Sequence, residues 1–311
     1  MSFNETAAKN PAPHETKRRG ECTIISNPCA GSGQCEVSLE AALWRFDAAG
    51  LRYRVLRTER PYHATQLALE AIESGAETLI VAGGDGTLRE VASALVGKAG
   101  VEVCILPFGT GNDFASALDI PADPLEAAEL ALYGEAKKCD LARANGTVYT
   151  NVCGLGFDVE VLKRVEKHKK GRKGMLPYAL GIIDALFTRK KIRARISIDG
   201  GETLELDTLL ITLCNGKRFG GGMLVAPDAS ADDGLIDVMI VKWIGFFKMI
   251  VLLPLFLKGG HIGKKPVIHC RARSIRVETQ YENTVETDGE LIERTPLLCE
   301  ILPAAINVVR P

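Results

Sequence analysis

Three short glycine-rich runs contain the residues best suited to hold a phosphate group: NPCAGSG at 27–33, GGDGT at 83–87 and GTGNDFA at 109–115. Glycines let a backbone come close to a ligand and adopt positive φ angles. The unpaired amides at the start of a following helix then bind phosphate oxygens. Because Asp85 would repel a bare phosphate, its presence implies a metal ion or a hydroxyl group between them. For GGDGT alone, the simpler alternative is a strand–turn–helix connection capped by Asp85.

The spacing of apolar residues predicts the elements that position these runs. Strands and helices alternate in the first half of the chain, which indicates a parallel sheet with helices on both faces. The predicted strands are 22–26, 53–58, 78–82 and 101–106, and the predicted helices are 38–49, 63–74, 87–95 and 123–134. All three runs follow strands of this sheet, so they converge on one crevice at the carboxyl ends of the strands. They match neither GxGxxG nor GxxxxGK[ST], which indicates a phosphate site of another type.

The second half of the chain predicts mainly antiparallel β-structure. Asn145-Gly146 and Asp199-Gly200-Gly201 are hairpin turn signals between apolar strand candidates. Two helical stretches, near 159–169 and 177–188, interrupt the strands. We therefore expect an α/β domain with a parallel sheet followed by an antiparallel β-sandwich. The expected divisions are a mobile leader at 1–20, the α/β domain at 21–138, the β-rich domain at 139–303 and a tail at 304–311 that returns to the first domain.

Composition narrows the class of protein. The 311 residues are 46% hydrophobic and 25% charged, which excludes disorder and coiled coil. The net charge of -1 gives no global attraction for nucleic acid. Nine cysteines without a CxxC pair indicate buried, reduced thiols in a cytosolic protein. The most apolar segment, 243–257, is too short to span a bilayer and contains Lys248 and Pro254, so we expect a buried core helix, with a contribution to membrane contact as the alternative.

The ordered set of motifs resembles the lipid kinases with a diacylglycerol-kinase catalytic domain, including bacterial diacylglycerol kinases, YegS-like proteins and sphingosine kinases. The resemblance runs from residue 22 to the C-terminus. Besides the three glycine-rich runs, it rests on FGGGM at 219–223, APDASADDGLID at 226–237 and TDGE at 287–290. GGDGT alone is less specific, because NAD kinases and phosphofructokinases share it. Arg89 departs from the Asn often found at its position.

The resemblance implies an ATP site and a catalytic pair. Glu290 would be the general base that takes the proton of a lipid hydroxyl, and Asp85 would hold the catalytic Mg²⁺. Asp113 would support this site or simply cap a helix. The implied nucleotide-binding residues are Asn27, Thr58, Gly83, Gly84, Asp85, Gly86, Thr87, Leu88, Arg89 and Thr110.

Two further features keep two readings each. The resemblance implies a second, structural Mg²⁺ held by Ser230, Asp233 and Leu235, whereas the alternative is a plain Asp-Gly turn. The basic run KRVEKHKKGRK at 163–173 is either a solvated helix end or a contact for anionic lipid headgroups.

The leading prediction is an ATP- and Mg²⁺-dependent lipid kinase that phosphorylates a lipid hydroxyl, with diacylglycerol as the first choice of substrate. The alternatives are a sphingosine-like or other lipid kinase, then a NAD kinase, then a non-catalytic nucleotide-binding regulator. The expected partners are ATP, the lipid and an anionic membrane surface, but no nucleic acid. We expect a cytoplasmic, peripherally membrane-associated protein, and a homodimer stays among the open oligomeric states.

Overall fold

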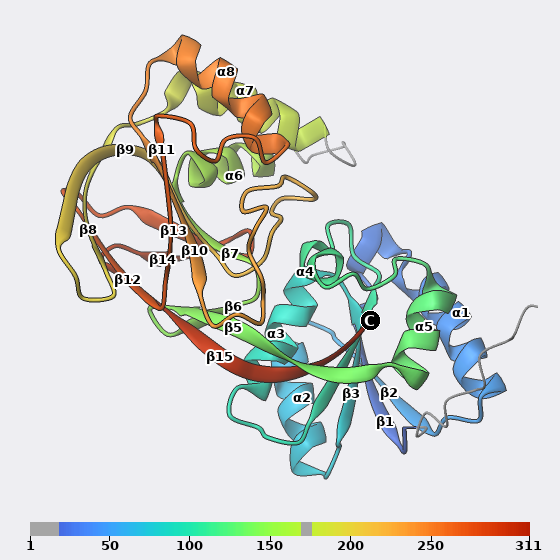
Figure 1. Ribbon diagram of the computed structural model, residues 1–311. Helices are drawn as coiled ribbons and strands as arrows, with labels where there is room; N and C mark the ends of the chain where they lie inside the picture. The colour runs from blue at the N-terminus through green and yellow to red at the C-terminus, as the bar shows by residue number, and fades with distance from the viewer. Residues whose placement is uncertain (1–18, 169–175) are drawn as a thin grey trace, which may run out of the picture.

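The computed structural model describes residues 19–168 and 176–311, which form two lobes joined by long strands (Figure 1). The predicted leader at 1–20 therefore lies almost wholly outside the described residues, as does the end of the basic run at 169–173. Within the first lobe, Arg19 donates to the carbonyls of Ala131 and Gly134.

The first lobe is built on a parallel sheet. Its strands are β1 (Cys22–Ser26), β2 (Tyr53–Arg57), β3 (Thr78–Gly83) and β4 (Glu102–Pro107), in the order β2-β1-β3-β4. Every residue of β1 and β3 is buried, because helices cover both faces of the sheet. The helical segments are η1 (Ala30–Gly33), α1 (Cys35–Ala48), α2 (His63–Glu73), α3 (Asp85–Leu95), α4 (Asp113–Ala117) and α5 (Pro124–Tyr133). The predicted α/β fold is confirmed.

Local sequence signals set the ends of these elements. The Asp123 carboxylate accepts hydrogen bonds from the amides of Leu125 at 2.9 Å and Glu126 at 3.1 Å, and Pro124 takes the first helical position of α5. Gly134 follows the last residue of the helix. The predicted start and end of this helix are confirmed.

The second lobe is mainly antiparallel, as predicted. Its strands are β5 (Glu135–Ala144), β6 (Thr147–Tyr149), β7 (Val152–Gly156), β8 (Ile192–Ile198), β9 (Thr203–Cys214), β10 (Ile236–Lys242), β11 (Val267–Ala272), β12 (Ser274–Thr279), β13 (Thr284–Thr287), β14 (Glu290–Arg294) and β15 (Leu297–Arg310). The helices α7 (Leu176–Thr188) and α8 (Phe246–Leu257) lie at the end of this lobe far from the first, and α6 (Phe157–His168) lies beneath them on the side of the first lobe (Figure 1).

The two lobes share one sheet. β15 pairs with β5 along much of its length, from Cys299 with Ala144 to Arg310 with Glu135. Near its end β15 also pairs in parallel with β4, through Asn307 and Val308. The last strand therefore carries the C-terminus into the first lobe (Figure 1). The domain boundaries at 138 and 303 stay predictions, because β5 and β15 belong to both lobes.

Some elements differ from the expectations. The short hairpin of β13 and β14 was not predicted, and β15 continues to Arg310 instead of ending near residue 302. The expected buried helix at 243–257 is only half buried. Met249 and Leu252 of α8 are buried, whereas Phe247 is 82% exposed and Val251 is 69% exposed. The expectation was wrong because only one side of α8 faces other elements.

The side chains fill separate cores. One apolar cluster lies on each face of the parallel sheet, one fills the β-structure of the second lobe, and one lies beneath α6, α7 and α8. The nine cysteines are free and seven of them are buried. Among the described helices, none has both the length and the apolar character needed to cross a bilayer.

Candidate active site

The glycine-rich runs meet at the carboxyl ends of β1, β3 and β4. Gly84 is the residue before α3, and a Cβ on Gly84 would lie 3.1 Å from the Gly109 Cα of the third run. A Cβ on Gly83 would lie 2.7 Å from Thr87 Oγ1. The runs therefore pack backbone against backbone, at distances that leave no room for side chains. The α3 amides at this point form an N-terminus suited to bind phosphate.

Polar side chains tie the first run to the second. Asn27 Nδ2 donates to Thr87 Oγ1 at 3.1 Å, and Asn27 Oδ1 accepts from the amide of Cys29. Thr110, in the third run, is exposed. Thr58 follows β2, where its amide donates to the Ser26 carbonyl at 2.8 Å. Of the predicted nucleotide-binding residues, Thr58 lies at the end of the neighbouring strand, whereas the others belong to the three runs or to the first turns of α3.

Two carboxylates face each other across Gly111. A Cβ on Gly111 would lie 3.0 Å from Asp85 Oδ2 and 3.6 Å from Asp113 Oδ2. Asp85 Oδ1 accepts from the amide of Phe114, and Asp113 Oδ2 accepts from the amide of Gly221 in the second lobe at 2.8 Å. Burial raises the pKa of Asp113 above its usual range. Both carboxylates line a polar cavity between the lobes.

The opposite wall of this cavity is the tight turn between β13 and β14. Asp288 and Gly289 have φ angles of 47° and 86°, as a two-residue hairpin turn requires. The Asp288 carboxylate accepts hydrogen bonds from the amides of Thr150, Asn151 and Val152. Asp288 therefore anchors the turn, and Glu290 follows as the first residue of β14.

Glu290 reaches the first lobe. Its Oε2 lies 2.6 Å from Arg89 Nη2, and its side chain is 46% exposed, whereas that of Arg89 is 4% exposed. A Cβ on Gly86 would lie 4.0 Å from Glu290 Oε1. The TDGE and GGDGT motifs are far apart in the sequence, but they lie against each other in the fold. The sequence did not predict the partner of Arg89.

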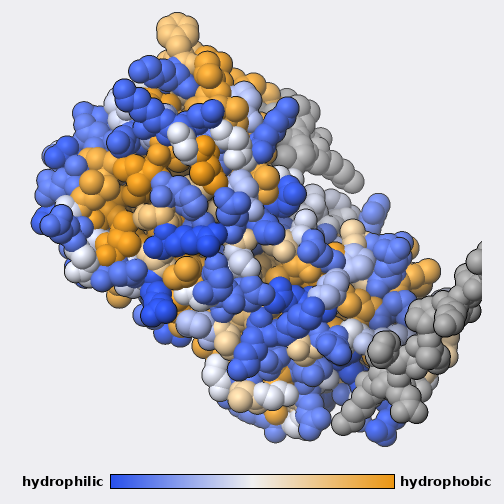
Figure 2. All heavy atoms as spheres, viewed as in Figure 1, coloured by the Kyte–Doolittle hydropathy of each residue, from blue (hydrophilic) through white to orange (hydrophobic). Residues whose placement is uncertain are grey.

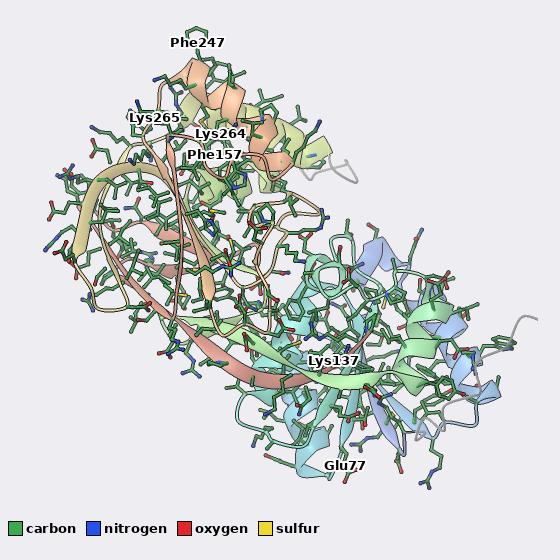
Figure 3. All side chains as sticks on the ribbon, viewed as in Figure 1. Glu77, Lys137, Phe157, Phe247, Lys264 and Lys265 are labelled. Atoms are coloured by element: carbon green, nitrogen blue, oxygen red, sulfur yellow. The ribbon has the colours of Figure 1, made fainter. Side chains whose placement is uncertain are left out.

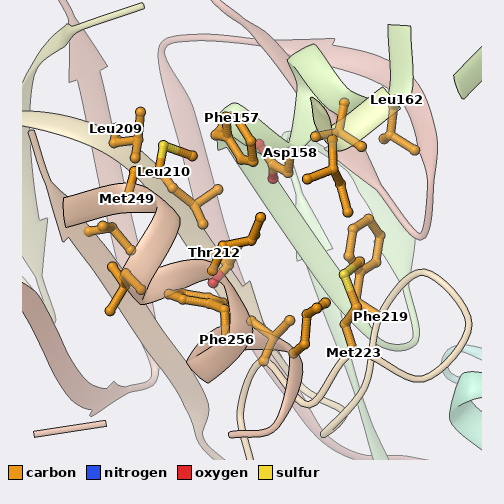
Figure 4. A pocket seen from close by; sticks show the side chains of 17 residues that line it. Phe157, Asp158, Leu162, Leu209, Leu210, Thr212, Phe219, Met223, Met249 and Phe256 are labelled. Carbon is orange, nitrogen blue, oxygen red and sulfur yellow. The ribbon is translucent and has the colours of Figure 1, made fainter. Parts of the chain in front are cut away.

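A second cavity, with mainly apolar walls, lies in the second lobe (Figure 4). Its walls come from α6, α7, α8, β9, β10 and the 219–225 loop. Leu162 and Phe219 line both this cavity and the polar cavity. An acyl chain in the apolar cavity would therefore place its polar end beside the carboxylates. Two polar side chains, Asp158 and Thr212, stand among its apolar walls (Figure 4).

Comparison with known proteins agrees with this arrangement. The diacylglycerol kinase catalytic domain model matches residues 21–144, and the YegS C-terminal NAD kinase beta sandwich-like domain model matches 151–310. A diacylglycerol kinase of Bacillus subtilis strain 168 is 32% identical over 93% of this chain and 95% of its own. A diacylglycerol kinase of Mycobacterium tuberculosis is 29% identical over 94% of this chain and 96% of its own.

The chain belongs to the diacylglycerol kinase catalytic-domain family. Among solved structures, a chain of Bacillus anthracis strain Sterne superposes with a TM-score of 0.81 at 30% identity, covering 96% of this chain and 99% of that one. A diacylglycerol kinase of the same strain superposes with a TM-score of 0.73 at 28% identity, covering 96% and 98%. This family membership makes the chain a lipid kinase.

The loop expected to hold a structural metal is tied by protein contacts in this lipid kinase. Asp233 Oδ1 accepts from the amide of Leu235 at 3.0 Å, and Asp233 Oδ2 lies 3.7 Å from the Arg271 guanidinium. Ser230 Oγ donates to Asp232 Oδ1 at 2.5 Å. Arg271 thus supplies a positive charge next to the carboxylate, and across 19–168 and 176–311 no group of three acidic, His or Cys side chains is arranged to hold a metal. The second metal site stays a prediction.

Proposed function

We propose that this lipid kinase transfers the γ-phosphate of ATP, with Mg²⁺, to the free hydroxyl of an acylglycerol such as diacylglycerol. The observation that carries the proposal is the position of Glu290. It directly follows Gly289, which lines the polar cavity together with Asp85 and Asp113, and this cavity shares Leu162 and Phe219 with the apolar cavity. The phosphate donor would bind in the polar cavity and the lipid hydroxyl would approach from the apolar cavity. Both groups would then lie near the Glu290 carboxylate.

The residues around Gly111 fit a divalent cation. Asp85 and Asp113 direct hard oxygen donors toward the same small space, and no side chain occupies it because residue 111 is a glycine. Mg²⁺ keeps several waters and needs one or two carboxylates beside phosphate oxygens. We assign the ion to Asp85 with support from Asp113. When bound, it would neutralise charge on the phosphates.

The chain's own groups would do the remaining work. The amides of Gly86 and Thr87, at the start of α3, would bind phosphate oxygens. Glu290 would accept the proton of the lipid hydroxyl. At the same time the hydroxyl oxygen of the lipid would form a bond to the γ-phosphorus, and the bond from this phosphorus to the leaving ADP would break. Arg89 contacts Glu290 and orients its carboxylate. Phe219 and Leu162 would exclude water from the hydroxyl side of the site.

Contact with a membrane is part of the proposal, because an acyl-chain substrate lies in a bilayer. The outer faces of α7 and α8 expose large apolar side chains at the end of the second lobe, where Figure 2 shows hydrophobic surface. Phe247 points away from the molecule, with Lys264 and Lys265 nearby (Figure 3). The exposed apolar residues are Ile183, Phe187, Phe247, Ile250, Val251 and Leu257. The inner faces of the same two helices line the apolar cavity.

We call this exposed set the α7–α8 face. Lys248 and Lys258 stand near the two ends of α8 and are exposed. An apolar face with flanking lysines fits the interface of an anionic bilayer. The face continues into the lining of the cavity, so a lipid would enter between α7 and α8. The described part of the basic run, at 163–168, lies on α6 beside this entrance, though Arg164 is paired with Glu160 at 2.8 Å.

A radiolabel transfer assay tests the proposed function. The chain is incubated with [γ-³²P]ATP and Mg²⁺, and separately with a lipid extract, dioctanoylglycerol, a sphingoid base or NAD as acceptor. We expect label in the acylglycerol, and its loss in Asp85→Ala with the fold retained. Label in the sphingoid base alone would favour the sphingosine-like alternative, and label in NAD alone would favour a NAD kinase. Binding of ATP with no acceptor labelled would favour a non-catalytic regulator.

A further inference from the structure

A row of side chains crosses three neighbouring strands beneath α6. Glu286 of β13 pairs with Gly154 of β7, and Gly154 pairs with Thr212 of β9. Paired residues on adjacent strands project from the same face of the sheet. Gly154 leaves the middle position empty, and the Asp158 carboxylate of α6 fills it: a Cβ on Gly154 would collide with Asp158 Oδ2 and lie 3.1 Å from Glu286 Oε1.

The row is buried and incompletely hydrogen-bonded. Exposure is 8% for Asp158, 3% for Thr212 and 0% for Glu286. One oxygen of each carboxyl has a partner, since Asp158 Oδ1 accepts from the amide of Val159 and Glu286 Oε2 from that of Gly289. The other three oxygens, Asp158 Oδ2, Glu286 Oε1 and Thr212 Oγ1, have no partner in the described structure. Buried polar groups normally have one, so a ligand with a matching group would be stabilised here.

Burial favours the neutral form of both carboxyls. It raises the pKa of Asp158 to about 7, and burial together with the facing Asp158 raises that of Glu286 well above its usual range. The other titratable groups that face the row are Asp288, Cys153 and Cys214, none of which is a cation. A neutral carboxyl carries an O–H donor. The row therefore offers O–H donors, besides the acceptor oxygens that each carboxyl and the Thr212 hydroxyl keep.

The position of the row limits which part of a lipid can reach it. Asp158 and Thr212 line the apolar cavity, and Leu162, one turn further along α6, also lines the polar cavity. Glu286 binds the Gly289 amide in the turn that holds Glu290. The row thus lies at the end of the apolar cavity next to the proposed base, where the polar neck of an acylglycerol would be found.

We propose that Asp158 and Thr212, backed by Glu286, donate hydrogen bonds to the ester carbonyl next to the reacting hydroxyl and so select ester-linked glycerolipids. This inference rests on the proposed function. An ester carbonyl is an acceptor without a proton, so it can accept the O–H donors of Asp158 and Thr212. An ether-linked glycerolipid lacks that carbonyl and would leave Asp158 and Thr212 unpaired.

Equilibrium binding tests the inference without relying on turnover. Calorimetry compares dioctanoylglycerol with its diether analogue, dioctylglycerol, for the wild-type chain at pH 6. A buried hydrogen bond of ordinary strength predicts about fivefold tighter binding of the diester. Asp158→Ala and Thr212→Val should each abolish most of this preference. Asp158→Asn keeps a donor and should retain it, whereas Glu278→Gln, at a half-buried carboxylate on β12 that is paired with Arg276, serves as the control.

The pH dependence separates this role from simple packing. The diester preference of the wild type should fall between pH 6 and pH 9, as Asp158 loses its proton, and should stay level in Asp158→Asn. Equal binding of diester and diether by the wild type would overturn the inference, as would tighter binding of a sphingoid base. Failure to label any lipid with ATP would contradict the proposed function instead, because the binding preference is measured separately.

Discussion

Glu290 and Arg89 join the two lobes at the scale of single residues. The guanidinium is almost fully buried and meets a half-exposed carboxylate at 2.6 Å. A buried cation needs an anion beside it, and the described structure leaves Arg89 Nε without a hydrogen-bond partner. Arg89 therefore depends on Glu290 for compensation, and Glu290 depends on Arg89 for its orientation.

Replacing Glu290 by Gln should keep the shape of the site and remove the base. We expect kcat for acylglycerol phosphorylation to fall by about 10²- to 10⁴-fold, the usual contribution of a general base. The affinity for ATP should stay near that of the wild type. The measurement is initial-rate labelling, with Glu282→Gln as the control, because Glu282 is an exposed partner of Arg294. Undiminished labelling by the Gln variant would remove Glu290 from its assigned role.

The sequence predicted site residues where a motif carries them. The glycine-rich runs, GGDGT and GTGNDFA among them, were expected at one crevice from local patterns, whereas TDGE was expected at the site from the family resemblance. These residues lie together in the fold. The contact of Arg89 with Glu290 could not be predicted, since it depends on how the lobes close. The row of Asp158, Thr212 and Glu286 depends on strand register, which no local pattern reveals. Gly154 was the one available signal, as a glycine inside a strand.

At the scale of elements, periodicity identified the parallel strands and most helices because each buries a regular face. The β13–β14 hairpin was not predicted, because β13 is only four residues long and buries a glutamate, Glu286. From the sequence alone, a charged side chain is predicted to be exposed. The apolar run at 243–257 was expected in the core for the opposite reason. A helix that contacts a membrane and a helix that is buried in the core can have the same apolar composition.

Variants of α8 test the α7–α8 face. Phe247→Ser should weaken binding to phosphatidylglycerol vesicles about tenfold, the value of one buried large apolar side chain. Its free energy of unfolding should change by less than about 0.5 kcal/mol, since Phe247 is 82% exposed. The measurements are vesicle flotation and urea unfolding.

Leu252→Ala supplies the contrast on the same helix. Leu252 is 7% exposed, so its truncation should lower the free energy of unfolding by about 2–4 kcal/mol. If Phe247→Ser binds vesicles as the wild type does, the α7–α8 face is not a membrane contact. If it instead changes the sedimentation of the free chain, the face joins two copies of the chain.

At the scale of the whole molecule, stability should depend on pH through Asp158. Its pKa is about 7 in the fold, against about 4 in an unfolded chain. The folded state keeps a proton that the unfolded state releases, so the contribution of Asp158 is full below about pH 4 and is lost as the pH rises through 7. Asp158→Asn cannot ionise and should escape that loss.

The urea midpoints of Asp158→Asn and the wild type measure this effect. The difference between the two, variant minus wild type, should be larger at pH 8 than at pH 5. Asp228→Asn is the control, because Asp228 is exposed. A difference that is equal at both pH values would show that Asp158 titrates like an exposed carboxylate.

The shared sheet holds the two lobes so that the polar and apolar cavities adjoin at Leu162 and Phe219, which line both. Blocking that junction is the most direct test of the account. Leu162→Trp should raise the KM for dioctanoylglycerol about tenfold or more while the Kd for ATP stays constant, because reacting groups must approach within bonding reach. Leu162→Ala, which leaves the junction open, should keep the lipid KM within a few-fold of wild type. Unchanged lipid kinetics in Leu162→Trp would contradict the claim that the two cavities form one active site.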